Sequence, residues 1–244
     1  MNDLIMTPLG SVSPYCKDNK NCPGFLIEYG KYNILLDCGN GISRYLSFAD
    51  VLNNLYVFLS HLHLDHFGDL GTIEYASYVY NKIGLLNEKV KIYTPVSKSM
   101  YNNYNYCDYY MINDNSFIKL NDLIITFHNN NSHDIECYMI KIETSKYKIV
   151  YTSDIGNRYL DDVIDYCKEC DLLICDSSLL IGQYNSNHLH AYEAGLIARD
   201  ASVKRLMLTH FWPEIDKEKY LEEAKEYFEN TIVAEENKKL ILRR

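Results

Sequence analysis

The sequence lacks any long apolar run. No stretch approaches the roughly 18 residues of a membrane span, and the N-terminal MNDLIMTPLG lacks the basic segment and apolar core of a signal peptide. We therefore expect a cytoplasmic protein without a membrane partner. Internal repeats and a linker rich in Pro, Gly or Ser are also absent, so we expect residues 1–244 to form a single domain.

The sequence has no excess of basic residues. Lys and Arg number 24 against 33 Asp and Glu, which gives a net charge of -9 at pH 7. Proteins that bind nucleic acid over a broad surface usually carry a basic face, so the composition argues against such a surface. A small anionic substrate held at a metal ion remains compatible with this charge.

The eight cysteines show no disulfide framework, because they are scattered and no secretion signal precedes them. Cys167 and Cys170 form a C-x-x-C pair, but no second pair completes a zinc ribbon. We interpret them as neighbours on one helical face. Cys16 and Cys22 bracket the polar loop CKDNKNC, and the sequence leaves open whether they close this loop or bind a metal.

The apolar pattern predicts strands in hairpins and strands that alternate with helices. FLIEYG and KYNILLDCG (25–39) are typical of a hairpin, and LYVFLS (55–60) of a buried strand. Further strands are expected at 90–95, 123–129, 137–144, 147–154, 171–178 and 205–210, and helices at 68–84, 158–170, 191–202 and 216–230. This mixture predicts an α/β (α+β) protein with two mixed sheets packed together and helices outside, a four-layer αβ/βα sandwich.

Ligand-type side chains stand where five of these strands end: Asp37, His61, Asp154, Asp176 and His210. Strand ends are rigid, and the loops around them converge on one edge of a sandwich. Such an edge can hold a metal ion with the accuracy that coordination requires. The recurrence of the pattern therefore indicates a metal site.

The densest group of such side chains lies in FLSHLHLDHFGDL (58–70). His61 and His63 are two apart and face the same side of an extended segment, whereas Asp65 and His66 follow the start of a turn. This spacing suggests two metal ions. Zinc usually takes three or four protein ligands, so further ligands must come from other segments. The candidates are His133, Asp154 and His210.

These segments resemble the metallo-β-lactamase superfamily. SHLHLDHFGDL resembles its H-x-H-x-D-H signature, ILLDCGNG its preceding Asp-x-Gly segment, SHDIECYMIKI its third metal motif, YTSDIG its bridging aspartate and LMLTHFWPEID its last histidine. The motifs occur in the family's order and cover about residues 5 to 240. The resemblance implies the metallo-β-lactamase fold and two Zn²⁺ ions per chain, with Mn²⁺ as an alternative.

The resemblance also implies a ligand set for each ion. One ion is held by His61, His63 and His133, the other by Asp65, His66 and His210, and Asp154 bridges them. Asp37 would orient a ligand imidazole. We prefer His133 to His128, because the family's ligand stands a few residues before an aromatic strand start, as in HDIECY.

Two further segments resemble the ribonuclease Z-like branch of this superfamily. DLLICDSS resembles a segment that ends in an acidic residue, here Asp176, and HLHAYEAGLIARDASVKRLMLTH resembles a run of a histidine, a helix and the last ligand strand. By this resemblance His188 is the catalytic histidine, which Asp176 orients and which protonates a leaving alkoxide. His190 stands where the family usually has Ser or Thr.

The resemblance implies a dinuclear-zinc-dependent hydrolase, and we expect a phosphodiesterase that acts on a small nucleotide or a short RNA-type phosphodiester. A metal-bridged hydroxide would attack phosphorus while the zinc ions neutralise the developing charge. Asp65 would both bind a metal and accept the proton of the attacking water. The alternatives are a lactone, thioester or β-lactam hydrolase on the same metal site, and a non-catalytic metal-binding scaffold.

The sequence departs from ribonuclease Z in three places. The family's Gly/Pro-rich arm, which grips tRNA, precedes the bridging aspartate, but here His133 and Asp154 are only 21 positions apart. HFWPEID lacks the family's basic residue after the last ligand, and SVSPYCKDNKNCPG lacks its Arg-Asn pair. We therefore expect a compact relative that acts on a small anionic phosphodiester and not on tRNA. Formation of a homodimer stays open.

Overall fold

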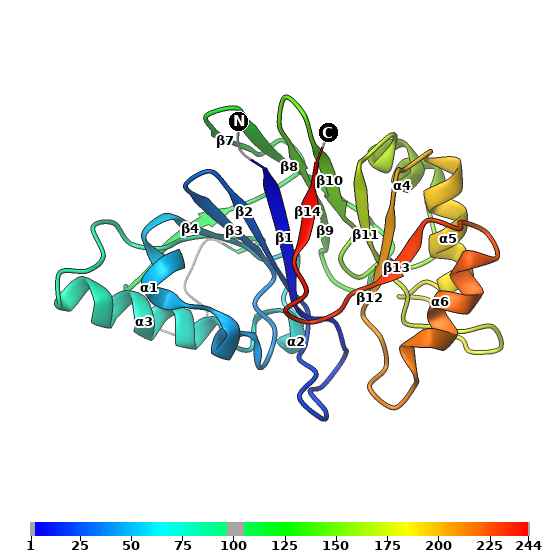
Figure 1. Cartoon of the computed structure of the whole chain (residues 1–244), viewed down its shortest axis with the longest axis horizontal. Helices are drawn as coiled ribbons and strands as arrows, with labels where there is room; N and C mark the ends of the chain where they lie inside the picture. The colour runs from blue at the N-terminus through cyan, green and yellow to red at the C-terminus, as the bar shows by residue number, and fades with distance from the viewer. Residues whose placement is uncertain (1–2, 97–104, 244) are drawn as a thin grey trace. The chain divides into compact units, whose positions relative to one another are not determined.

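The computed structural model describes residues 3–96 and 105–243 (Figure 1). Contacts divide the chain into two compact units, each with its own seven-stranded sheet. Unit 1 comprises Met1–Gly10, Tyr15–Ile112 and Glu235–Arg243, and unit 2 comprises Ser11–Pro14 and Asn113–Ala234. That residues 1–244 form a single domain stays a prediction.

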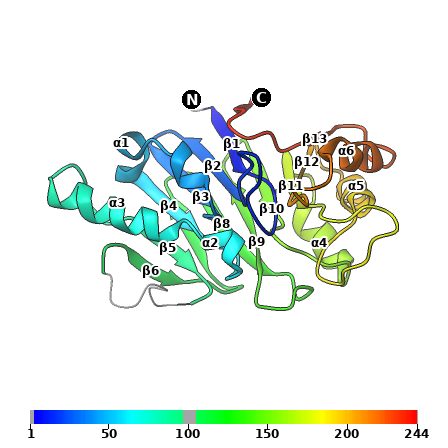
Figure 2. The same ribbon diagram turned by 90° about the horizontal axis from the view of Figure 1, so that it is seen from below.

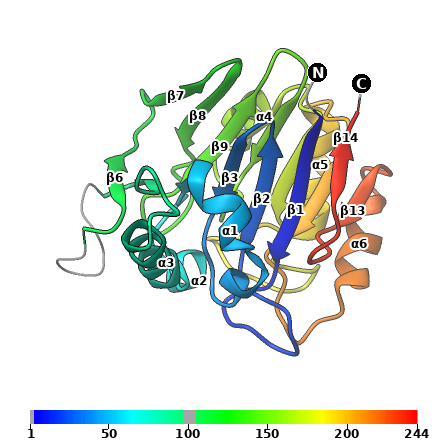
Figure 3. The same ribbon diagram turned by 60° about the vertical axis from the view of Figure 1, so that its left-hand side comes forward.

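The sheet of unit 1 has the order β14-β1-β2-β3-β4-β5-β6. Its strands are β1 Leu4–Gly10, β2 Gly24–Tyr29, β3 Tyr32–Leu36, β4 Leu55–Phe58, β5 Lys91–Thr94, β6 Asp108–Met111 and β14 Leu240–Leu242. The strands from β14 to β3 are antiparallel, and those from β3 to β6 are parallel. Figure 3 shows the C-terminal β14 beside the N-terminal β1.

Helices cover one face of this sheet. They are α1 Phe48–Val51, α2 Leu64–Phe67 and α3 Leu70–Lys82, with 3-10 turns at Ile42–Tyr45 and Leu52–Asn54. Leu35, Val57 and Ile92 lie at matched positions of β3, β4 and β5 and pack into one core cluster with Val51 of α1 and Ile73 of α3. Burial of these side chains fixes the parallel part of the sheet, and with it the loop that follows each strand.

The sheet of unit 2 has the order β13-β12-β11-β10-β9-β8-β7. Its strands are β7 Phe117–Leu120, β8 Leu123–Asn129, β9 Tyr138–Glu143, β10 Lys148–Tyr151, β11 Leu172–Asp176, β12 Leu206–Thr209 and β13 Thr231–Val233. The strands from β7 to β10 are antiparallel, and those from β10 to β13 are parallel. All five residues of β11 are buried, as its central position requires.

Three helices pack on the parallel part of this second sheet, as Figure 2 shows. They are α4 Leu160–Cys167, α5 Ala191–Asp200 and α6 Lys217–Lys225. Val163 of α4, Ile197 of α5 and Tyr220 of α6 share one core cluster with strand residues such as Leu173 and Leu208. Among the described residues, no helix has the length and apolar character that crossing a membrane would take.

All four predicted helices are shorter than expected, α4 and α6 by the most. α6 ends at Lys225, five residues before the predicted end at 230. α4 ends at Cys167, so Cys170 lies beyond the helix and the prediction of a shared helical face is wrong. Both thiols are nevertheless fully buried, and burial raises the pKa of Cys170 to about 12. Cys167 is therefore a core residue at the end of α4, and Cys170 is a core residue in the loop that leads into β11.

Candidate active site

The first group of predicted ligands follows the carboxyl end of β4 in unit 1. His61 and His66 are fully buried, and Asp65 and His66 lie within the single turn of α2. Nε2 of His61 lies 3.2 Å from Nδ1 of His63, and Nε2 of His66 lies 3.7 Å from a carboxylate oxygen of Asp65. Nitrogen atoms of His61 and His63 therefore face each other, and the Asp65 carboxylate lies beside the ring of His66.

Asp37 supports this group from the neighbouring strand. It follows β3 directly, is fully buried, and adopts a left-handed backbone with φ 57°. Its Oδ2 accepts a hydrogen bond of 2.7 Å from Nδ1 of His66, and the backbone N–H of Ser60 donates to Oδ1 at 2.8 Å. Asp37 thereby fixes the ring of His66 and the chain just before His61.

Gly39 explains the glycine of the D-x-G segment. A Cβ at this position would lie 2.2 Å from the carbonyl oxygen of Asp65, so any larger residue would push the two loops apart. The same loops are joined by a hydrogen bond of 2.7 Å from the N–H of Cys38 to the carbonyl of His66. The glycine therefore permits the close approach that positions Asp65 and His66.

The second group of predicted site residues gathers in unit 2 at the ends of consecutive parallel strands. Asp154 follows β10, Asp176 ends β11, and His210 follows β12 with φ 67°. Ligand-type atoms of these three residues and of His188 all lie within 4.8 Å of one another. Nε2 of His133 lies 3.8 Å from the Asp154 carboxylate, so this residue joins the group from the loop after β8.

His188 and Asp176 form the hydrogen-bonded pair that the sequence predicts. Nδ1 of His188 lies 2.9 Å from Oδ2 of Asp176, and the ring stacks on that of His210 at 5.0 Å between centroids. Burial lowers the pKa of His188, but the charge of Asp176, its hydrogen bond and the charge of Asp154 together outweigh burial, so this pKa lies above its usual value. The pair can hold a proton at Nε2.

His128 and His190, which we did not choose as functional residues from the sequence, make other contacts. His128 lies at the end of β8, where its ring stacks on Tyr166 at 5.2 Å. His190 is the N-cap residue of α5 and hydrogen-bonds to Glu193 at 2.9 Å. Capping of α5 is thus the work of His190 and not of His188. The choice of His188 and His133 as functional residues stays a prediction.

Two serines that were not predicted from the sequence touch predicted ligands. Ser60 Oγ lies 2.9 Å from Nδ1 of His61, and Ser178 Oγ lies 2.7 Å from Nδ1 of His210. Ser60 directly precedes the H-x-H-x-D-H segment, and Ser178 is the last residue of DLLICDSS. A hydroxyl residue adjoining a ligand or an orienting acid was the signal that could have identified them.

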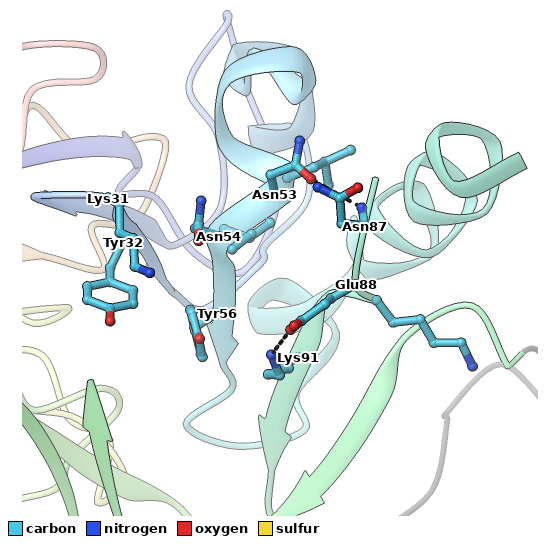
Figure 4. A pocket seen from close by; sticks show the side chains of 11 residues that line it. Lys31, Tyr32, Asn53, Asn54, Tyr56, Asn87, Glu88 and Lys91 are labelled. Atoms are coloured by element: carbon cyan, nitrogen blue, oxygen red, sulfur yellow. Dashed lines mark hydrogen bonds and ion pairs between the residues drawn. The ribbon is translucent and has the colours of Figure 1, made fainter. Parts of the chain in front are cut away.

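A polar cavity of about 370 Å³ lies elsewhere in unit 1. Figure 4 shows its lining, which includes Lys31, Tyr32, Asn54, Tyr56 and Lys91. These side chains come from the amino ends of β3, β4 and β5 or from the segments before them. The predicted ligands follow the carboxyl ends of the strands, so the cavity lies at the opposite edge of the sheet and is not part of the candidate site.

The comparison with known families decides the assignment. Residues 32–211 match the family model described as the beta-lactamase superfamily domain. The chain belongs to the beta-lactamase superfamily. This confirms the resemblance seen in the motifs. It also confirms, at the level of the superfamily, the prediction of a metal-dependent hydrolase.

Several superfamily relatives match this member over most of its length. It is 28% identical over 216 residues to the Probable metallo-hydrolase YhfI of Bacillus subtilis, which covers 85% of this chain and 86% of the relative. It is 27% identical over 301 residues to the ribonuclease Z of Archaeoglobus fulgidus, which covers 95% of each.

Solved structures confirm the fold. The crystal structure of the metallo-beta-lactamase fold protein YhfI from Bacillus subtilis matches with a TM-score of 0.88 at 24% identity, over 98% of this chain and 99% of that one. The human tRNase Z, short form, matches with a TM-score of 0.74 at 19% identity, over 97% and 98%. The predicted α+β metallo-β-lactamase fold is therefore confirmed.

The residues present fit the divalent metal that this family implies. His66 donates from Nδ1 to a carboxylate, so its neutral ring presents a lone pair at Nε2. In unit 2, Nε2 of His210 lies 3.0 Å from Oδ1 of the buried Asp154. Imidazole nitrogens with carboxylate oxygens are a donor set for zinc and for related divalent ions.

Proposed function

We propose that the protein is a dinuclear-zinc phosphodiesterase of the ribonuclease Z-like kind, which acts on a small nucleotide or a short RNA-type phosphodiester. The observation that carries this proposal is the pair of His188 and Asp176. The imidazole is held at 2.9 Å by a fully buried carboxylate, among the ligand-type side chains of unit 2. A lactone or a β-lactam already has an activated acyl group, whereas a ribose leaving group requires a proton donor.

The proposed metal ligands are those that the superfamily resemblance implies. His61, His63 and His133 would hold one Zn²⁺ and Asp65, His66 and His210 the other, with Asp154 available to both and Mn²⁺ as an alternative ion. Such a pair supplies a water of lowered pKa and neutralises charge on the phosphoryl oxygens. Family membership and the burial of most of these side chains at strand ends support the assignment.

The protein's own groups handle the protons. Asp65 accepts the proton of the attacking water, because its carboxylate belongs to the ligand group. His188 donates from Nδ1 to Asp176, so Nε2 is the atom that gives its proton to the leaving oxygen. The Asp176 carboxylate stabilises the protonated ring and keeps its orientation, as an orienting acid does for a catalytic histidine.

The size of the chain supports a small substrate. The alignment with the archaeal ribonuclease Z extends over 301 residues, whereas this chain has 244, so that enzyme carries insertions that this chain lacks. Together with the short interval from His133 to Asp154, this supports a substrate other than tRNA. All eight cysteines lie in the described part of the chain and none forms a disulfide, which supports a cytoplasmic location. A homodimer stays an open alternative.

The proposal is tested by comparing three substrate classes on one zinc-loaded preparation. We expect hydrolysis of bis(p-nitrophenyl) phosphate, with little turnover of a γ-lactone or nitrocefin, and we expect His128→Ala to leave the rates unchanged. Turnover of the lactone or nitrocefin without the diester would replace the proposal with an acyl hydrolase. Full metal content without turnover of any of the three would identify a non-catalytic scaffold.

A further inference from the structure

Each unit contains a buried carboxylate that holds two imidazoles, one directly and one through a serine hydroxyl. In unit 1 the carboxylate is Asp37. It accepts from Nδ1 of His66 at 2.7 Å and from Oγ of Ser60 at 2.9 Å. The same Ser60 Oγ lies 2.9 Å from Nδ1 of His61. Asp37, Ser60, His61 and His66 all have 0% exposed surface.

Unit 2 repeats this arrangement with different segments. The carboxylate is Asp176, which ends β11. It lies 2.9 Å from Nδ1 of His188, and Oγ of Ser178 donates to it at 2.7 Å. The Ser178 Oγ also lies 2.7 Å from Nδ1 of His210. The same four-group pattern therefore occurs twice, although its serine precedes a histidine in unit 1 and follows the aspartate in unit 2.

Counting protons fixes the direction of each serine contact. A hydroxyl has one proton to donate. Ser60 gives its proton to the Asp37 carboxylate, so its oxygen must accept from Nδ1–H of His61. Ser178 has two oxygen neighbours that can only accept, the Asp176 carboxylate at 2.7 Å and the His210 carbonyl at 2.9 Å. Its oxygen must therefore accept from Nδ1–H of His210.

We propose that Ser60 and Ser178 are matched positioning residues for metal binding. Each holds one imidazole with its proton on Nδ1, and so keeps the lone pair of Nε2 directed at the metal ion. This inference rests on the ligand roles of His61 and His210 in the proposed function. It extends that function, because hydrogen bonds beyond the ligands raise their basicity and fix their rings.

The two serines differ in what they connect. Ser60 joins a proposed ligand, His61, to the Asp37 carboxylate, which holds a second proposed ligand, His66. Ser178 joins a proposed ligand, His210, to the carboxylate that orients the proposed proton donor His188. Loss of the Ser178 hydroxyl should therefore weaken metal binding and also disturb Asp176. Loss of the Ser60 hydroxyl should weaken metal binding without disturbing Asp176 and His188.

The test measures zinc affinity by competition with a chromophoric chelator in wild type, Ser60→Ala and Ser178→Ala. We expect each alanine variant to bind zinc about 10- to 100-fold more weakly. Ser60→Thr and Ser178→Thr keep the hydroxyl and should recover most of the affinity. Nitrogen-15 spectra of histidine-labelled, zinc-loaded protein should show the Nδ1–H signals of His61 and His210 in wild type and their perturbation in the alanine variants.

Matched controls separate positioning from general destabilisation. Ser177 Oγ donates to the Thr209 carbonyl at 2.9 Å, and Ser77 Oγ donates to the Tyr106 carbonyl at 2.7 Å. Both serines are fully buried. Ser177→Ala and Ser77→Ala should lower thermal stability by similar amounts but leave zinc affinity within about twofold of wild type, because neither hydroxyl contacts an imidazole.

Two results would overturn the inference. One is wild-type zinc affinity in both alanine variants, and the other is an equal loss of affinity in the Ser177→Ala control. Either result leaves the proposed function standing if the wild type still binds two zinc ions and hydrolyses the diester. Failure of the wild type to bind zinc at all would instead remove the proposed function, and with it the ligand roles on which the serines depend.

Discussion

Asp65 combines two roles in the proposed chemistry, as a metal ligand and as the acceptor of the water's proton. Asp65→Ala should therefore lower kcat by about 10²- to 10⁴-fold. The melting temperature should change far less, because Asp65 is not part of the apolar core clusters of the described residues. Steady-state kinetics on bis(p-nitrophenyl) phosphate, with elemental analysis of the same sample, would measure both. A variant with near wild-type kcat and both metals bound would contradict the assignment.

His188 should matter most for substrates whose leaving group is a poor one. His188→Ala should lower kcat on a ribodinucleotide by about 10²- to 10⁴-fold, and less on a p-nitrophenyl ester, because p-nitrophenolate leaves without a proton. Asp176→Asn should act in the same direction but more weakly. Measuring kcat on both substrates in wild type and in each variant tests whether His188 is the proton donor.

Equal losses on the two substrates would remove the proton-donor role of His188. His128→Ala is the matched control, because that imidazole lies at the end of β8 and stacks on Tyr166 instead. It should leave the ratio of the two rates unchanged.

At the residue scale, the sequence singled out imidazoles and carboxylates that the structure groups within each unit, but not the two serines that contact them. Imidazoles and carboxylates at strand ends are conspicuous, because such groups are rarely placed beside buried strands without a use. A serine in the same place is common in loops. Only its contacts with Asp37 and His61 distinguish Ser60 from an ordinary loop residue.

Helix α5 begins with an ionisable cap. The backbone N–H of His190 donates to Glu193, and its ring nitrogens lie 2.9 Å from Glu193 Oε2 and from the Gln183 carbonyl. Burial lowers the pKa of His190, but these acceptors raise it by more, so the net pKa lies above its usual value. The protonated ring is therefore favoured in the folded state.

This cap should make stability depend on pH. A raised folded-state pKa contributes stability that is present below the unfolded pKa of about 6.5 and is lost as pH rises through the folded pKa. His190→Ala should lower the melting temperature by a few degrees at pH 5.5, since a cap contributes roughly 1 kcal/mol, and by less at pH 9. A thermal scan at both values measures this. A difference that stays constant with pH would show that the ring acts only by packing.

At the scale of secondary-structure elements, the sequence predicted the central strands of the two sheets but not their edge strands. The central strands β4, β10, β11 and β12 have continuous apolar sequences, because both faces are buried. Strands β6, β7, β13 and β14 have three or four residues each and carry weak patterns. β1 was missed because Pro8 and Gly10 argue against a strand. Its partner β14 pairs only with Leu4–Met6, so no hydrogen bond to β14 is lost because Pro8 lacks an N–H.

The metal content belongs to the scale of the whole molecule. We expect about two zinc or manganese ions per chain in protein purified without chelator, because seven ligand-type residues are available for them. Removal of the ions should abolish turnover and lower the melting temperature, since a bound ion stabilises only the folded state. Elemental analysis and thermal scans before and after chelation measure both effects. Full activity in a metal-free preparation would refute the prediction.

Neither unit is continuous along the chain. Unit 1 takes its last strand, β14 at Leu240–Leu242, from beyond the whole of unit 2, and pairs it with β1 at Leu4–Met6. During synthesis β1 therefore keeps one unpaired edge until more than 230 further residues have been added. This pairing raises the contact order of the fold, and a higher contact order slows folding. A strand edge left open for so long is also a site for aggregation. The nascent chain should depend on chaperones more than its size alone would suggest.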